Sequence, residues 1–353
     1  MDFTLLIESV AFGGAGIGRL PDGRVCFVAG TLSGERAVVR LTKEKKNYTE
    51  GEVVRLVERS MHRTLPRCPV YGTCGGCSYQ HADYEYQLDL KTAQVADVFR
   101  RIGGFADARV ERTIASPRQW EYRNRISVHI EDGRVGFHHR KTRKLIPVAH
   151  CPIACAEVNE QLATLAAAPR RRGNARLTLR APSPHRGFSQ VNEAAAEKLL
   201  DVIREMTAGA SGQLVDAYCG AGFFAKALAG QFEKVTGIEW SEGAIRAAIE
   251  SAGPNETYLQ GAVENHLAET LRTGDPSQTT LLLDPPAEGL APDVTAAVLE
   301  NAPHRLIYIS CDPATLARDL KKLSTTYVIE CIQPVDMFPQ TAEIEVAVSC
   351  RKR

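Results

Sequence analysis

One cysteine near the carboxyl end of the chain stands where a strand would give way to a helix. Residues 305–310 read RLIYIS, which is typical of a buried strand, and Cys311-Asp-Pro follows at once before ATLARDL. A thiol at the amino end of a helix has its thiolate favoured by unpaired N–H groups and the helix dipole. The pattern therefore favours a nucleophile at Cys311 over a small buried side chain, the interpretation that suits Cys331 and Cys350.

A second group of cysteines lies close together near residue 70. The stretch PRCPVYGTCGGCSYQH holds Cys68, Cys74 and Cys77, and HCPIAC supplies Cys151 or Cys155 as a fourth thiol. Four thiolates suit either zinc or an iron–sulfur cluster, and the intervening glycines let the chain wrap around such a centre. The residue types alone do not rank the two metals.

A glycine-containing turn predicts a ligand site. QLVDAYCGAGFFAKALA reads as an apolar strand ending in Asp216, a turn from Cys219 to Gly222 and a helix, so backbone can approach a ligand closely. Glu239 ends the next strand, where a carboxylate can accept from ribose hydroxyls. A dehydrogenase would share a lone GxG, but Ala225 stands where the third glycine of G-x-G-x-x-G would be. The pattern favours an adenosyl ligand over a purely structural turn.

The following strand ends in LLLDPPAEGL, which places Asp284 at the same edge of the predicted sheet. The two prolines stiffen the loop without needing backbone donors. Because carboxyl ends of parallel strands share one edge, the glycine turn, the Asp-Pro-Pro loop and Cys311 are expected to meet in one crevice.

The elements that must position these residues fall into three segments. Residues 1–58 alternate short β-rich runs with Gly-rich turns such as GGAGIG and PDG, the pattern of a small antiparallel barrel. The runs cover residues 3–10, 25–28, 37–42 and 51–57. Residues 59–185 hold the cysteine group, one helical stretch over 84–102 and a strand-rich basic part.

From residue 186 to 353, helical patterns alternate with apolar strands. Such alternation indicates a parallel α/β sheet with crossover helices. The predicted strands cover residues 213–216, 234–239, 280–284 and 305–310.

Composition narrows the class of protein. The chain has 353 residues, of which 44% are hydrophobic and 24% charged, and no window of eighteen apolar residues, so it reads as a globular protein of two or three domains. An acidic residue follows Met1 where a signal peptide needs basic residues, so we expect a cytoplasmic protein. In that compartment the 10 cysteines are poor evidence for disulfides.

Charge is unevenly distributed although the net charge is only +1. Residues 100–180 carry 17 Lys and Arg against 7 Asp and Glu, and the same stretch contains Trp120, Tyr122, Phe137 and two histidines, His138 and His139. A solvated charged face is one explanation. Concentrated arginine with interleaved aromatic rings is also what phosphate contact and base stacking require.

Several motifs together resemble one family. GGAGIGRLPDGRVCFVAGTLSGERAVVRLTKEKKNY looks like a TRAM domain, and CPVYGTCGGCSYQH with Cys151 looks like a cluster site. FSQVN, DAYCGAG, DPPAEG, SCDPATLARDL and DMFPQTAEIEVAVSC follow in the family's order. Over nearly its whole length the chain resembles the RNA 5-methyluridine (uracil-C5) methyltransferases that use S-adenosylmethionine, in the branch with a TRAM domain and a 4Fe–4S cluster.

The resemblance implies an α/β fold: a Rossmann-like methyltransferase domain with a parallel-rich sheet, an amino-terminal OB-fold (TRAM) β-barrel and a small α+β central domain with the iron–sulfur cluster. It divides the chain into an RNA-binding TRAM domain at 1–58, a central domain with a basic RNA-contacting surface at 59–185, and the methyltransferase domain at 186–353. FSQVN and the four motifs that follow it in the sequence belong to the methyltransferase domain.

The resemblance also assigns residues. The iron ligands it implies are Cys68, Cys74, Cys77 and Cys151, with Cys155 as a spare. The cofactor-binding positions it implies are Gln190, Tyr218, Glu239 and Asp284, with Asp216 and Gly220 contributing to the turn. The nucleophile is Cys311 and the catalytic base is Glu345, for which an acid on the surface of an edge strand is the alternative.

Two positions depart from the family pattern. The family usually has Arg after Asp-Pro-Pro, where this chain has Ala287, and often has His two residues before the base, where this chain has Glu343. Neither position performs the central step. The departures concern local RNA contacts, substrate preference and rate.

The chemistry explains the residue types. Carbon 5 of uracil is too weak a nucleophile to attack a sulfonium methyl, so a thiolate first adds to carbon 6 and generates an enolate. After methylation, a base removes the proton from carbon 5 and the thiolate leaves. The uridine must also be unstacked from folded RNA, which gives the basic region and the barrel a use.

We therefore expect an enzyme that methylates carbon 5 of a specific uridine in structured RNA. Ribosomal RNA is the favoured target and tRNA the alternative. A non-catalytic RNA-binding protein would not need Cys311 and Glu345, and a small-molecule methyltransferase would not need the barrel or the basic region. We expect a monomer that binds RNA rather than DNA or a membrane.

Overall fold

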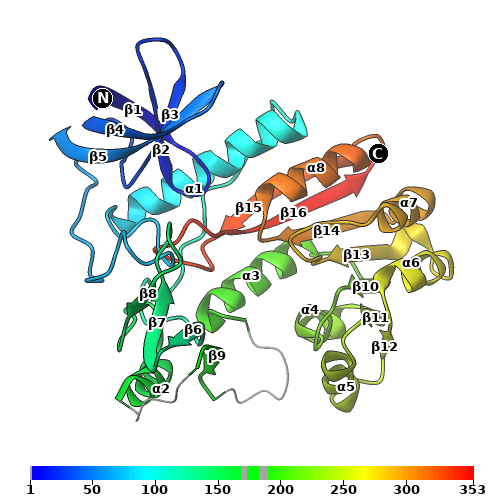
Figure 1. Cartoon of the computed structure of the whole chain (residues 1–353). Helices are drawn as coiled ribbons and strands as arrows, with labels where there is room; N and C mark the ends of the chain where they lie inside the picture. Colours follow the sequence, from blue (N-terminus) through cyan, green and yellow to red (C-terminus); the bar gives the residue numbers. More distant parts are fainter. Residues whose placement is uncertain (1, 168–172, 183–189) are drawn as a thin grey trace. The chain divides into compact units, whose positions relative to one another are not determined.

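The computed structural model describes residues 2–167, 173–182 and 190–353 (Figure 1). The chain forms two compact units, each built from separate stretches of sequence. The first comprises Met1–Gln94, Pro117–Pro182 and Phe338–Glu343, and the second comprises Val95–Ser116, Ser183–Met337 and Ile344–Arg353. The boundary predicted between residues 185 and 186 lies outside the described residues, as does part of FSQVN. Within the described ranges, no helix has both the length and the apolar character that crossing a bilayer requires.

The amino-terminal strands close into a barrel in the order β1-β2-β3-β5-β4, which confirms the predicted barrel. Alternating side chains such as Leu5, Ile7 and Val39 fill its interior. The prediction that all strands of the barrel are antiparallel is wrong, because β3 and β5 run parallel. The strands are β1 (Asp2–Val10), β2 (Ala15–Arg19), β3 (Val25–Ala29), β4 (Arg36–Glu44) and β5 (Tyr48–Glu58).

GGAGIG was predicted to be a turn, and this is wrong for its second half. Gly13 and Gly14 have positive φ and reverse the chain, but Gly16 and Gly18 lie within β2. A Cβ at Gly16 would stand 2.0 Å from the Thr31 hydroxyl oxygen. Glycine is therefore needed in this strand for close packing inside the barrel.

The first unit also contains a small antiparallel sheet in the order β8-β7-β6-β9. The strands are β6 (Arg125–Glu131), β7 (Arg134–His138), β8 (Leu145–Pro147) and β9 (Ala175–Arg180). Helix α2 (Ala156–Ala167) covers one face through a core that includes Val128, Leu162 and Leu179. Because side chains alternate along a strand, the polar side chains of β6 and β9 lie on the other face.

The helix predicted over residues 84–102 is α1 (Tyr84–Val98), followed by a wide helical turn over Phe99–Gly103. Its residues up to Gln94 belong to the first unit. There the Lys91 ammonium, which is almost fully buried, donates to the carbonyl oxygens of Phe338 and Glu343 at 3.2 and 2.8 Å. These bonds compensate the cost of burying the charge and hold the segment that precedes Glu345 in the chain.

The second unit is built on a seven-stranded sheet in the order β12-β11-β10-β13-β14-β16-β15. The first five strands are parallel, and they are β10 (Gln213–Ala217), β11 (Lys234–Glu239), β12 (Glu256–Gln260), β13 (Thr279–Leu283) and β14 (Arg305–Ser310). Four of these were predicted almost to the residue. The prediction of a parallel sheet is wrong at one edge of the sheet. There β16 (Glu345–Lys352) pairs antiparallel with β14 and with β15 (Tyr327–Val335).

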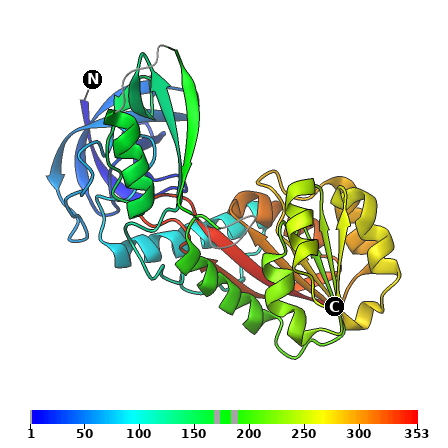
Figure 2. The same ribbon diagram turned by 90° about the horizontal axis from the view of Figure 1, so that it is seen from below.

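Helices cover both faces of this sheet (Figures 1 and 2). One face carries α3 (Glu193–Met206), α4 (Phe223–Leu228) and α5 (Glu242–Glu250). The other carries α6 (Val263–Arg272), α7 (Pro292–Asn301) and α8 (Pro313–Leu323). Burial on both faces explains why β10 and β13 are apolar runs without alternation.

Candidate functional site

The carboxyl end of β10 opens the candidate ligand site. Tyr218 follows the strand with φ 70°, a left-handed conformation that is uncommon for a residue with a side chain. Gly222, with φ 84°, then caps α4. The chain turns sharply here, as the Cys-Gly-Ala-Gly motif predicted.

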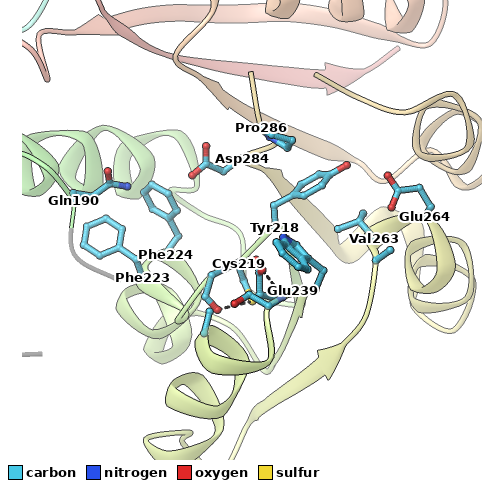
Figure 3. A pocket seen from close by; sticks show the side chains of 15 residues that line it. Gln190, Tyr218, Cys219, Phe223, Phe224, Glu239, Val263, Glu264, Asp284 and Pro286 are labelled. Atoms are coloured by element: carbon cyan, nitrogen blue, oxygen red, sulfur yellow. Dashed lines mark hydrogen bonds between the residues drawn. The ribbon is translucent and has the colours of Figure 1, made fainter. Parts of the chain in front are cut away.

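A pocket of about 540 Å³ lies at this edge of the sheet (Figure 3). Five of the six predicted cofactor residues line it, and these are Gln190, Tyr218, Gly220, Glu239 and Asp284. The site is therefore formed by residues that are more than ninety positions apart in the sequence. Its location at the carboxyl ends of parallel strands is where open α/β sheets bind their ligands.

Glu239 ties two loops of the pocket together. Its Oε2 accepts from the Gly220 amide at 3.1 Å and its Oε1 accepts from the Ser241 amide at 2.8 Å (Figure 3). Each carboxylate oxygen has a second lone pair. The carboxylate can therefore fix the turn and still accept from a ligand hydroxyl.

Asp216, the sixth predicted residue, does not line the pocket. It is fully buried at the end of β10, where its Oδ2 accepts from the Ala225 amide at 3.0 Å in the first turn of α4. Burial, and then the charge of Asp284, raise the pKa of Asp216 to about 8. Asp216 thus supports the turn rather than the ligand.

Several residues of the pocket escaped the sequence analysis, and Trp240 stands out. Its side chain is 74% exposed although it is a large aromatic ring, and it lines the pocket with Phe223 and Glu264. The signal was its place directly after Glu239 in KVTGIEWS. An exposed ring beside a carboxylate can stack on a flat heterocycle while the carboxylate binds hydroxyls.

Cys311 and Glu345 lie at the same edge of the sheet. Cys311 directly follows β14, Glu345 begins β16, and the antiparallel register pairs their chain neighbours Ser310 and Val346. The charge of Glu345 acts on the Cys311 thiol, so the two side chains are near each other. The predicted nucleophile and base are thus brought together from positions 34 residues apart.

Asp284 connects this pair to the pocket. Its charge acts on the Cys311 thiol and on the Glu345 carboxyl, and it also lines the pocket. Burial raises the pKa of Asp284 to about 7. Burial, followed by the charge of Asp284, raises the pKa of Glu345 well above its ordinary value.

The prediction that the helix terminus favours the Cys311 thiolate is wrong for this state of the protein. Burial, then the charges of Glu345 and Asp284, raise the pKa of Cys311 to about 11. Asp312 caps the start of α8, because its Oδ1 accepts from the Ala314 and Thr315 amides at 2.8 and 3.0 Å. The helix terminus is therefore neutralised by its own cap, and the thiol needs a nearby base.

The loop after Asp284 is locked onto α8. Asp319, which is fully buried, accepts from the Leu290 amide at 2.9 Å and from the Tyr308 hydroxyl at 3.1 Å. Arg318 donates to the Glu288 carbonyl at 2.8 Å. The wall of the pocket and the helix that follows Cys311 are thereby joined. Ala287, the first departure from the family pattern, is exposed in this loop.

Comparisons with known proteins agree with this geometry. The family described as tRNA (uracil-5-)-methyltransferase matches residues 177–353, and the TRAM domain matches residues 2–54. The chain is 30% identical to an uncharacterized RNA methyltransferase of Gloeobacter violaceus, over 99% of this chain and 96% of the relative. It is 32% identical to an uncharacterized RNA methyltransferase of Thermosynechococcus vestitus, over 97% and 96%.

The chain belongs to the tRNA (uracil-5-)-methyltransferase family. It is an S-adenosylmethionine-dependent RNA (uracil-5-)-methyltransferase with an amino-terminal TRAM domain. The tRNA (uracil-54, C5)-methyltransferase of Pyrococcus abyssi, solved in complex with S-adenosyl-L-homocysteine, superimposes with a TM-score of 0.73. That match covers 99% of this chain and all of the other at 23% identity, which establishes a common fold.

The methyltransferase also gathers the thiols that were predicted to bind iron. Burial raises the pKa of Cys77 to about 12, with further repulsion from Cys151, Cys74 and Cys68, so the four thiols are electrostatic neighbours. Burial also raises the pKa of Cys151, where Cys68 and Cys74 contribute again. The thiol of Cys155 interacts with Glu157 instead. In the part of the chain that the structure describes, no group of three or more His, Cys, Asp or Glu side chains is arranged to hold a metal ion.

Proposed function

We propose that this methyltransferase modifies carbon 5 of one uridine in a structured RNA through a covalent bond between Cys311 and carbon 6. The observation that carries the proposal is the proximity of Cys311, which directly follows β14, to Glu345, which begins β16, beside a pocket that contains Asp284. A thiol and a carboxyl this close can act on neighbouring atoms of a single ring. A small-molecule methyltransferase that attacks a ready nucleophile would not need both.

The Cys311 thiol begins the reaction by giving up its proton. With a pKa of about 11 it is mostly protonated at neutral pH, and the carboxylates of Glu345, Asp284 and Asp312 all act on it. Asp284 has a raised pKa, which makes it a better proton acceptor than an ordinary carboxylate, and transfer of the thiol proton to Asp284 leaves Glu345 able to accept the later proton from carbon 5. Sγ then bonds to carbon 6 while the electrons of the ring double bond move to the oxygen on carbon 4.

Glu345 completes the reaction in its ionised form. Once carbon 5 bears the methyl group, the Glu345 carboxylate takes the remaining proton from carbon 5. The electron pair left behind restores the ring double bond and expels the Cys311 thiolate. Glu345 therefore has to be ionised at that point, whereas Cys311 has to have lost its proton earlier.

The pocket fits S-adenosylmethionine, which supplies an electrophilic methyl group when bound. Glu239 offers lone pairs for ribose hydroxyls, Trp240 offers an exposed ring for the adenine, and Gly220 leaves open space where a side chain would project. Gln190 and Asp284 supply polar groups on the other side of the pocket. Asp216 acts by shaping the glycine turn.

We also propose that Cys68, Cys74, Cys77 and Cys151 hold a 4Fe–4S cluster. The support is the donor set, because four cysteine thiols are what an iron–sulfur cluster binds, and each of these thiols acts electrostatically on others of the set. A cluster would relieve this repulsion, because iron stabilises thiolates. Cys155 is not part of this group, so we assign the fourth ligand to Cys151. The cluster would hold the long connection between residues 77 and 151 in place.

The proposed division of labour assigns the TRAM domain (1–58) and the central domain (59–185) to RNA binding and the segment 186–353 to catalysis. Ribosomal RNA remains the proposed target, on the strength of the combined TRAM and cluster motifs. A tRNA target is the second candidate, and the name of the Pyrococcus abyssi enzyme favours it.

A single comparison tests the proposal. The 5-methyluridine of tRNA and ribosomal RNA is mapped in cells with the gene, without it, and with a Cys311→Ala copy. One uridine should lose its methyl group in the last two strains, and its position names the RNA. If every 5-methyluridine persists in both, the proposed function is wrong.

A further inference from the structure

The small sheet of the first unit has one face that α2 leaves uncovered. Three side-chain pairs on that face follow from the register of β6 and β9, namely Arg125 with Arg180, Ser127 with Thr178, and His129 with Arg176. The side chains of β9 in these pairs are exposed and those of β6 are half-buried. We call these six residues the platform.

The platform places positive charges directly opposite each other. Arg125 and Arg180 are partners across the two strands, where side chains of like charge repel. Burial, then the charges of Arg180 and Arg123, lower the pKa of Arg125, so these two arginines repel it. Such an arrangement is costly by itself and becomes favourable when an anion lies between the guanidinium groups.

A pair of hydroxyl groups lies between the arginine pair and the pair of His129 with Arg176. The Ser127 and Thr178 oxygens lie 3.4 Å apart, and Arg176 donates to the Ser127 hydroxyl at 3.5 Å. Hydroxyls and guanidinium groups are the side chains that most often bind the phosphates and sugars of nucleic acids. The donors follow the strands in a row, which suits an extended anionic chain better than a single small anion.

A flat surface adjoins this row. The rings of His129 and His138 are stacked with their centroids 3.6 Å apart and their planes 16° from parallel. The Nε2 atom of His138 bonds to Glu131 Oε1 at 2.9 Å, which fixes the ring. A fixed imidazole pair offers a surface on which an unpaired base can stack.

We propose that the platform, together with His138, binds an unpaired stretch of the substrate RNA outside the target uridine. Phosphates contact the arginines and a base stacks on the histidine pair. The proposal rests on RNA being the substrate, as proposed above. Charge complementarity and the stacked rings select single-stranded RNA over duplex, whose bases are already stacked on one another.

The test is binding of a short fluorescein-labelled oligouridylate to the full-length protein, measured by anisotropy at several potassium chloride concentrations. The double variant Arg176→Ala/Arg180→Ala should bind roughly tenfold more weakly at low salt. The slope of log affinity against log salt should become shallower by about 0.7 for each lost phosphate contact. His129→Ala should weaken binding at least about fivefold, whereas His129→Phe, which keeps a flat ring, should retain it.

A matched control removes the same charge elsewhere. Lys234 begins β11 and Arg272 ends α6, so both lie at the amino edge of the large sheet, away from the pocket. Lys234→Ala/Arg272→Ala should leave affinity and salt slope unchanged. Far-ultraviolet circular dichroism confirms that every variant is folded.

The outcomes separate this inference from the proposed function. If the platform variants bind with wild-type affinity and slope, or if the control pair weakens binding equally, the platform is not an RNA site. Binding needs no turnover, so this result stands whether or not the wild-type protein methylates RNA. Absence of methylation in the wild-type protein would contradict the proposed function alone.

Discussion

Cys311 and Glu345 lie near each other because β16 returns antiparallel beside β14, where their chain neighbours Ser310 and Val346 pair. The strand pair sets both side chains at the carboxyl edge of the parallel strands, next to Asp284. Had β16 joined the sheet in parallel, the end at residue 345 would have lain at the opposite edge. The antiparallel strand is therefore what makes a thiol and a carboxyl available to one substrate ring.

The proposed roles of the pair predict different failures when either is removed. Cys311→Ala should form neither methylated RNA nor a covalent protein–RNA species, because carbon 6 is never attacked. Glu345→Gln should permit addition and methyl transfer but block proton loss, so the protein stays bonded to methylated RNA. Turnover should fall by about 10²- to 10⁴-fold, the usual contribution of a general base. A denaturing gel with labelled RNA and S-adenosylmethionine detects the complex.

The double variant Cys311→Ala/Glu345→Gln is the control, and its lane should show no slow-migrating complex. Normal turnover by Glu345→Gln would mean that another residue is the base. Glu343, whose side chain is exposed, is the nearest in sequence. Activity in Cys311→Ala would contradict the covalent mechanism.

The pKa of Cys311 predicts how fast its thiol is alkylated. At a pKa of about 11, roughly one thiol in a thousand is ionised at pH 8, so modification by iodoacetamide should be slow and should accelerate as the pH rises. Glu345→Gln removes a neighbouring negative charge and should lower that pKa, which speeds alkylation several-fold between pH 8 and 10. Mass spectrometry of the peptide that contains Cys311 follows the reaction, and equal rates in both proteins would contradict the predicted interaction.

Much of this site could be predicted from the sequence because its parts are local motifs at strand ends. Apolar runs ending in Asp284 and Cys311 define strands whose carboxyl ends must share an edge if the strands are parallel. The protonation of Cys311 could not be predicted in the same way. It depends on Glu345 and Asp284, which reach the thiol only after the sheet has formed.

The proposed cluster predicts a coloured, iron-containing protein. Protein purified without oxygen should be brown and contain about four irons per chain. Cys74→Ser should lose colour, iron and thermal stability, because one of the four ligands that tie residues near 70 to Cys151 is missing. Cys155→Ser is the matched control, since its thiol is not among the four neighbours, and it should keep the iron. A colourless protein that contains zinc would overturn the assignment.

Other features escaped sequence analysis because glycine and carboxylate have many uses. GGAGIG suggested a turn, yet Gly16 is needed where Thr31 crowds the barrel interior. Asp216 was expected to contribute to the turn, but its full burial and its bond from the Ala225 amide could not be predicted. In each case the decisive neighbour is distant in sequence or lies on the other side of a turn. Trp240 was overlooked because a single exposed ring carries no periodic signal.

The buried carboxyl of Asp216 predicts a dependence of stability on pH. Its pKa is about 8 in the folded protein and 3.8 ordinarily, so between these values the folded state holds a proton that the unfolded state releases. Its contribution to stability therefore falls as the pH rises from about 4 to about 8. Asp216→Asn removes this loss and should melt at least a few degrees higher at pH 8, with a smaller difference at pH 5 and none near pH 4. Thermal unfolding beside exposed Asp201→Asn measures the effect, and parallel curves would contradict it.

Gly289 supports the last prediction, which concerns the joint between the pocket wall and α8. It has φ 83°, and a Cβ there would stand 2.3 Å from both Asp319 Oδ2 and the Thr315 methyl carbon. Gly289→Ala should therefore push the loop that carries Pro286 away from α8 and cost about 1–3 kcal/mol of stability. Because Pro286 lines the pocket, binding of S-adenosylhomocysteine should weaken as well. Calorimetry measures the affinity and thermal unfolding the stability. Ala287→Gly, two residues away on the exposed side of the same loop, should change neither by as much, and equal losses in the two variants would show that loop flexibility matters rather than the contact with Asp319.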